Sequence, residues 1–98
     1  MARRGELLES RAVVPENVVQ RAFDAETLML NLGTGTYHGV DGTGTRTLEL
    51  LGETGGDVSL SIERLANEHG LAPGEIADDL LDFLAQLVDR GLLELRPR

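Results

Sequence analysis

The clearest hydrophobic pattern lies in the middle of the N-terminal half. Leu28, Leu30 and Leu32 occupy alternate positions, and this two-residue period predicts a strand with the leucines on its apolar face. Residues 33–35, Gly-Thr-Gly, interrupt the run, and glycine permits the positive φ that a hairpin loop needs. Residues 36–40 include Thr, Tyr and Val, which favour a second strand.

This hairpin is expected to end a small antiparallel sheet. Pro15 cannot donate to a strand ladder, so it predicts a bend within an interrupted first strand. Residues 24–26 connect that strand to the hairpin. The expected order across the sheet is residues 11–23, then 26–32, then 36–40. Because the chain after Asp41 looks helical, the last strand is expected to have one open edge, which is either a liability or a binding site.

Two shorter helices are expected to follow the hairpin. Thr43 is a plausible N-cap for a helix whose apolar stripe lies in residues 47–51. Ser59 or Ser61 can cap the next helix, which runs to about His69. With the sheet, these helices predict an α+β fold in which one side of the sheet is covered.

The third helix has the strongest pattern. It begins near Pro73 and ends at Gly91. Its apolar residues recur at three- and four-residue spacing and are Ile76, Ala77, Leu80, Leu81, Phe83, Leu84, Leu87 and Val88. They span an arc of roughly 160°, wider than one sheet contact needs. Residues 92–95 suggest a short final strand.

The whole chain of 98 residues therefore reads as a single domain, residues 1–98, whose first ten residues are expected to be flexible. The predicted fold class is α+β: a three-stranded antiparallel sheet packed on three helices, with a winged-helix-like arrangement.

The charge of the chain limits the classes of partner that it can bind. The net charge is −8, from 17 acids and nine bases, all of them arginine. Eleven of the acids but only Arg64 and Arg90 lie between Glu49 and Glu94. Such a surface repels nucleic acid and anionic membranes and attracts a cationic partner, although an acidic surface also simply keeps a small protein in solution. A winged-helix DNA-binding regulator remains the alternative, but its recognition helix would carry the wrong charge.

Candidate chemistry is sparse. There is no cysteine, no apolar run near the roughly 20 residues of a membrane span, and no signal peptide, so a cytoplasmic location is expected. His38 and His69 lack the spacing of a zinc site. Asp78, Asp79 and Asp82 fit a solvated helix face better than general acid–base catalysis. The glycine-rich stretch is followed by no lysine. No catalytic residue, cofactor or metal is therefore predicted, and the chain is not expected to be an enzyme.

Two segments resemble PqqD-like proteins. Residues 30–44, Leu-Asn-Leu-Gly-Thr-Gly-Thr-Tyr-His-Gly-Val-Asp-Gly-Thr-Gly, resemble the hairpin and helix entry of that family, and residues 47–51 look like its first helix. Residues 76–93 are similar to its third helix and the Gly-Leu ending. The resemblance covers roughly residues 13–95. It implies a non-catalytic recognition element for ribosomally synthesised and modified peptides, with a sheet of three strands on three helices.

The resemblance also implies the partners. The leader of a precursor peptide would add as a strand beside the third strand and lie against the third helix. The Thr-Gly-Thr-Tyr-His-Gly hairpin looks most like the lasso-peptide version, which works with a separate leader peptidase and, as a further partner, a cyclase. The pyrroloquinoline quinone version would instead serve a radical enzyme. A structural subunit of a partner enzyme is another alternative, and the open edge can also pair with a second copy to form a homodimer.

Two elements are expected to form the peptide-binding site. The third strand supplies an open edge, and the surplus apolar width of the third helix supplies pockets. The helix has two lines of apolar residues. The line assigned to the cleft floor consists of Ile76, Leu80, Phe83 and Leu87. The line assigned to the core consists of Leu81, Leu84 and Val88. The expected peptide-binding residues are Thr36, Tyr37, His38, Gly39, Val40, Ile76, Asp79, Leu80, Asp82, Phe83 and Leu87.

Overall fold

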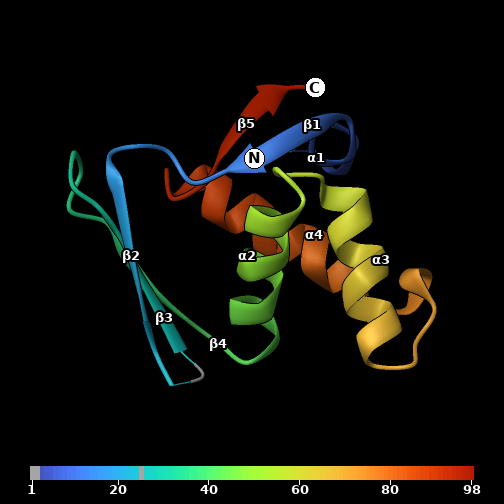
Figure 1. The fold of residues 1–98 in the computed structure, drawn as a ribbon. Coiled ribbons are helices and arrows are strands. Elements are labelled where there is room, and N and C mark those ends of the chain that lie inside the picture. Colours follow the sequence, from blue (N-terminus) through green and yellow to red (C-terminus); the bar gives the residue numbers. More distant parts are fainter. Residues whose placement is uncertain (1–2, 25) are drawn as a thin grey trace.

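A computed structural model describes residues 3–24 and 26–98. It has a three-stranded sheet on one side, helices packed beside it, and a two-stranded ribbon formed by the ends of the chain (Figure 1). The elements in chain order are α1 (Arg4–Glu9), β1 (Ser10–Val13), β2 (Val18–Phe23), β3 (Glu26–Asn31), β4 (Tyr37–Asp41), α2 (Thr43–Glu53), α3 (Val58–Glu68), α4 (Pro73–Asp89) and β5 (Glu94–Pro97). The predicted α+β class, with a three-stranded antiparallel sheet and helices, is confirmed.

The strand order in the sheet is β2-β3-β4. The predicted pairing of its last two strands, β3 and β4, is confirmed. The prediction of a single interrupted first strand was wrong, because its two parts belong to different sheets. β1 pairs with β5, with Ser10 opposite Pro97, whereas β2 pairs with β3, with Val18 opposite Asn31. Pro15 lies in the segment between them, where the chain crosses from one sheet to the other. The predicted connection at residues 24–26 includes Ala25, which lies outside the described residues.

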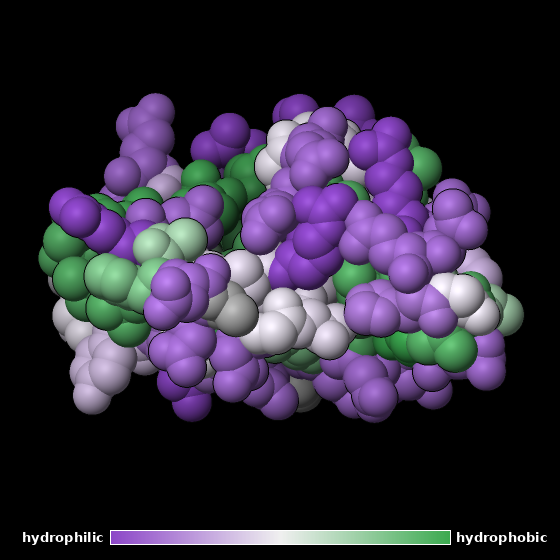
Figure 2. Space-filling view, turned by 60° about the horizontal axis from the view of Figure 1, so that its bottom comes forward, coloured by the Kyte–Doolittle hydropathy of each residue, from purple (hydrophilic) through white to green (hydrophobic). Residues whose placement is uncertain are grey.

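The prediction of which β3 side chains face the core was also wrong. Leu28 and Leu32 are 43% and 63% exposed, whereas Met29 is fully buried and Thr27 and Asn31 are nearly so. The leucines therefore point away from the helices. Figure 2 shows the resulting hydrophobic surface at its left end, where the sheet lies in Figure 1. The two buried polar side chains are both hydrogen-bonded, which makes their burial tolerable.

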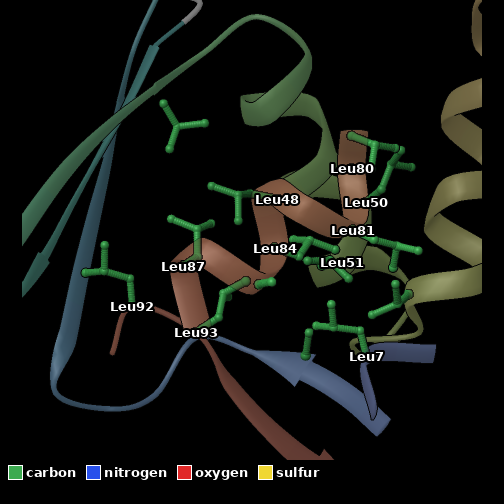
Figure 3. Packing of buried hydrophobic residues seen from close by; sticks show 14 of the residues in the cluster. Leu7, Leu48, Leu50, Leu51, Leu80, Leu81, Leu84, Leu87, Leu92 and Leu93 are labelled. Atoms are coloured by element: carbon green, nitrogen blue, oxygen red, sulfur yellow. The ribbon is translucent and has the colours of Figure 1, made fainter. Parts of the chain in front are cut away.

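The core lies between the helices and the inner face of the sheet. Leucine side chains of α1, α2 and α4 converge there with those that follow α4 (Figure 3). The fully buried leucines are Leu7, Leu50, Leu65, Leu84, Leu87 and Leu92, the residues at or below 1% exposure. No helix of the described residues is long and apolar enough to cross a membrane.

Residues 4–9 form α1, where the sequence predicted a flexible segment. Leu7 is completely buried in the core, and Arg4 pairs with Asp78 and Asp82 of α4. Two adjacent leucines in an otherwise polar stretch, of which only Leu7 is fully buried, were too weak a signal to predict this docking. Met1 and Ala2 lie outside the described residues.

Two predicted helix caps also differ. α2 begins after Gly42, so Thr43 is its first residue rather than its cap. Asp57 caps α3, because its side chain accepts a hydrogen bond of 3.0 Å from the Leu60 N–H. Ser61 instead donates to the Asp57 carbonyl at 2.7 Å.

Candidate functional site

Strand β4 has one paired edge and one open edge. The Asn31 N–H donates to the Thr36 carbonyl at 2.8 Å, so the main chain of Thr36 faces β3. The direction of main-chain hydrogen bonds alternates along an antiparallel strand. The N–H and C=O groups of Tyr37, Gly39 and Asp41 therefore point away from the sheet. No strand within residues 3–24 and 26–98 pairs with this edge.

A cleft of about 990 Å³ lies beside the open edge. It is bounded by β4, by the loop that leads into α2, and by the N-terminal half of α4. The residues that line it are Glu26, His38, Gly39, Val40, Asp41, Gly42, Thr43, Gly44, Ile76, Asp79, Leu80 and Phe83. An open strand edge thus runs along an open groove whose far wall is a helix.

The floor of the cleft is apolar and closely packed. A Cβ placed on Gly44 would lie 2.5 Å from Val40 Cγ1 and 3.1 Å from Phe83 Cζ, so both side chains rest against the α2 backbone. Phe83 and Ile76 are half-buried, and Leu80 is buried. These side chains offer apolar surface that a bound peptide can cover.

Seven of the eleven predicted site residues line this cleft. They come from two elements that are far apart in the sequence, β4 and α4. They are His38, Gly39, Val40, Ile76, Asp79, Leu80 and Phe83. The structure therefore brings together the strand edge and the helix face that the sequence paired.

The other four predicted residues lie outside the cleft lining. Leu87 is fully buried in the core, because α4 turns that part of its apolar face inward. Asp82 accepts a hydrogen bond of 3.1 Å from Arg4. Tyr37 is 69% exposed and does not line the cleft, although its main chain belongs to the open edge. Thr36 lies in the hairpin loop, just before β4.

Five lining residues were not predicted, and four of them lie where the end of β4 leads into the start of α2. They are Glu26, Asp41, Gly42, Thr43 and Gly44. The hairpin register could have found the first two, because Glu26 is the partner of Asp41 across β3 and β4. Counting back from the Gly33–Gly35 loop along both strands places them opposite each other.

The cleft offers binding groups rather than a cluster of reactive ones. Within the described residues, no group of three or more His, Asp or Glu side chains could hold a metal ion. What the site presents is a row of free main-chain donors and acceptors, an apolar floor and three acidic residues in its lining. These features suit an extended peptide that carries its own main-chain hydrogen-bonding groups.

Comparison with known proteins agrees with this geometry. Residues 26–93 match the family described as Coenzyme PQQ synthesis protein D (PqqD). A solved structure, "TbiB1 in Complex with the TbiA(beta) Leader Peptide", is similar to the chain with a TM-score of 0.75 and 34% sequence identity, and the alignment covers 84% of this chain and 94% of that one. No curated protein sequence matches significantly. The chain belongs to the PqqD family, whose members are recognition elements for ribosomally synthesised and modified peptides.

Proposed function

We propose that the chain binds the leader segment of a ribosomally synthesised precursor peptide as an added strand on the open edge of β4. The observation that carries this proposal is the juxtaposition of that edge with the apolar cleft against α4. The similarity to a structure that holds a leader peptide supports it. Main-chain hydrogen bonds to Tyr37, Gly39 and Asp41 would supply affinity, and the cleft would supply side-chain specificity.

The energetics favour moderate affinity. A leader that is unstructured in solution loses conformational entropy when it orders as a strand. The apolar surface of Ile76, Leu80 and Phe83 and the new main-chain hydrogen bonds offset that loss. The expected dissociation constant is therefore between about micromolar and tens of nanomolar.

The biological role proposed for this binding is that of a non-catalytic adaptor in the cytoplasm. The adaptor holds the leader while a separate leader peptidase and a cyclase act on the precursor of a lasso peptide. The hairpin sequence Thr34–Gly39 supports the lasso version over the pyrroloquinoline quinone version. A second copy could compete for the β4 edge, so the binding experiment should monitor the oligomeric state.

The test is a fluorescence-anisotropy titration with synthetic leader peptides taken from the short reading frames beside the gene. Saturable binding of one peptide, displaced by its unlabelled form, is the expected result. If the folded protein binds none of them, the adaptor role is wrong, and co-purification with a partner enzyme would then support a structural subunit.

A further inference from the structure

The cleft beside β4 is acidic as well as apolar. Its lining includes the acidic residues Glu26, Asp41 and Asp79 and contains no arginine. The chain contains no lysine, and none of its nine arginines lies in the lining, so no basic lysine or arginine side chain there neutralises these acids. His38 is the one other titratable side chain in the lining.

These three carboxylates have no cationic partner in the described part of the chain. Several acids outside the cleft do: Asp78 and Asp82 pair with Arg4, and Glu68 pairs with Arg46 at 2.6 Å. The fold thus uses its arginines elsewhere and leaves the cleft acids free for a ligand.

The register of the sheet makes this arrangement unfavourable in the empty protein. Glu26 and Asp41 are direct partners across β3 and β4. Like charges in directly opposed positions destabilise a sheet. Asp79 adds a third negative charge from α4 at the other wall of the same cleft. A cationic side chain bound in the cleft near these residues would reduce this repulsion.

We infer that the leader segment recognised by this chain carries a lysine or arginine beside a bulky apolar residue. The negative charges of Glu26, Asp41 and Asp79 attract the cationic side chain, and the floor formed by Phe83 and Ile76 binds the apolar one. This inference rests on the proposed function, because it specifies the ligand of the same cleft. Each exposed ion pair contributes only modestly, so the basic residue determines selectivity more than total affinity.

An unbiased selection tests the inference. A display library of random peptides is selected on the immobilised full-length protein. The expected result is enrichment of peptides with a basic residue at a fixed spacing from an apolar one, and a loss of about two- to fivefold in affinity when that residue is changed to glutamine. Enriched peptides without a basic preference would overturn this inference and leave the proposed function standing. If no peptide is enriched, both are wrong.

Variants that remove the negative charges give a second test. These variants are expected to fold, so a loss of affinity would not be explained by unfolding. Glu26→Gln, Asp41→Asn and Asp79→Asn combined should weaken a selected basic peptide about tenfold. Their melting temperature should not fall, because the repulsion is removed. Glu63→Gln, which removes one charge from an exposed site on α3, is the matched control for Asp79→Asn and should bind normally. Unchanged affinity in the triple variant would contradict the inference.

Discussion

The side-chain amide of Asn31, at the end of β3, donates a hydrogen bond of 2.8 Å to the carbonyl of Gly91, just beyond α4. The same side chain accepts hydrogen bonds from the N–H groups of Gly33 and Thr34 in the hairpin loop. The sheet is therefore joined to the C-terminal end of α4. The cleft opens between the sheet and the N-terminal half of that helix.

Asn31→Ala should lower the free energy of unfolding by about 1–3 kcal/mol, because a buried, fully hydrogen-bonded side chain is lost. Asn31→Asp is the sharper variant, since it keeps an acceptor for the loop but cannot donate to Gly91. Urea denaturation measures both. Asn67→Ala, at an exposed site on α3, should change stability by less than about 0.5 kcal/mol. If Asn31→Asp is as stable as wild type, the link to Gly91 is unimportant.

Gly44→Ala should destabilise the protein by about 1–3 kcal/mol, because its Cβ would clash with Val40 and Phe83 in the cleft floor. Gly52→Ala, in the same helix, meets no atom within 4 Å. That substitution should stabilise the protein by up to about 1 kcal/mol. Thermal denaturation of the pair checks both signs. Equal effects of the two substitutions would show that the floor of the cleft is not closely packed.

Phe83→Asp should reduce leader affinity at least about tenfold, since a charge replaces the apolar floor of the cleft. Phe83 is half-buried, so this variant is a safer test than Leu80→Asp, which alters a buried position. Asp57→Ala is the control. It removes the cap of α3 and costs about 1 kcal/mol of stability, yet it should leave affinity unchanged. Wild-type affinity in a folded Phe83→Asp variant would remove α4 from the binding site.

Arg46 connects α2 to α3 through Glu68 and also contacts Glu49 and Glu53. Hydrogen bonds from its guanidinium, with its charge, hold the pKa of Glu68 below the ordinary value. A lowered carboxyl pKa contributes stability that is present above the unfolded pKa and is lost as the pH falls through the folded pKa.

Arg46→Gln should therefore lower the melting temperature at neutral pH by a small amount, because the pairs are exposed. The difference from wild type should shrink as the pH falls below about 4.3, the ordinary glutamate value. Arg64→Gln, on the exposed side of α3, is the control for loss of an arginine. A difference that persists in acid would mean that Arg46 acts through packing rather than through these ion pairs.

The parts of the fold that the sequence predicts are those with long, one-sided patterns. The three- and four-residue spacing of α4 and the Gly-Thr-Gly loop between β3 and β4 placed the helix face and the strand edge that border the cleft. Both are local features, and neither depends on a partner distant in the sequence.

The errors arise where a distant contact overrides the local pattern. The leucines of β3 form the more hydrophobic face, but Asn31 must face inward to reach Gly91, which is sixty positions later in the chain. Thr27 faces inward as well and bonds Thr45 at 3.3 Å. Likewise, β1 pairs with β5 at the opposite end of the chain. Hydropathy cannot show that a buried polar side chain will find its partner.

Amide hydrogen exchange, measured by NMR with and without the bound leader, tests strand addition on β4 most directly. If the leader adds as a strand, the N–H groups of Tyr37, Gly39 and Asp41 should become protected when it binds. Those of His38 and Val40, which already pair with β3, should change little. Protection along β2 instead, or no alternating pattern on β4, would contradict strand addition at the β4 edge.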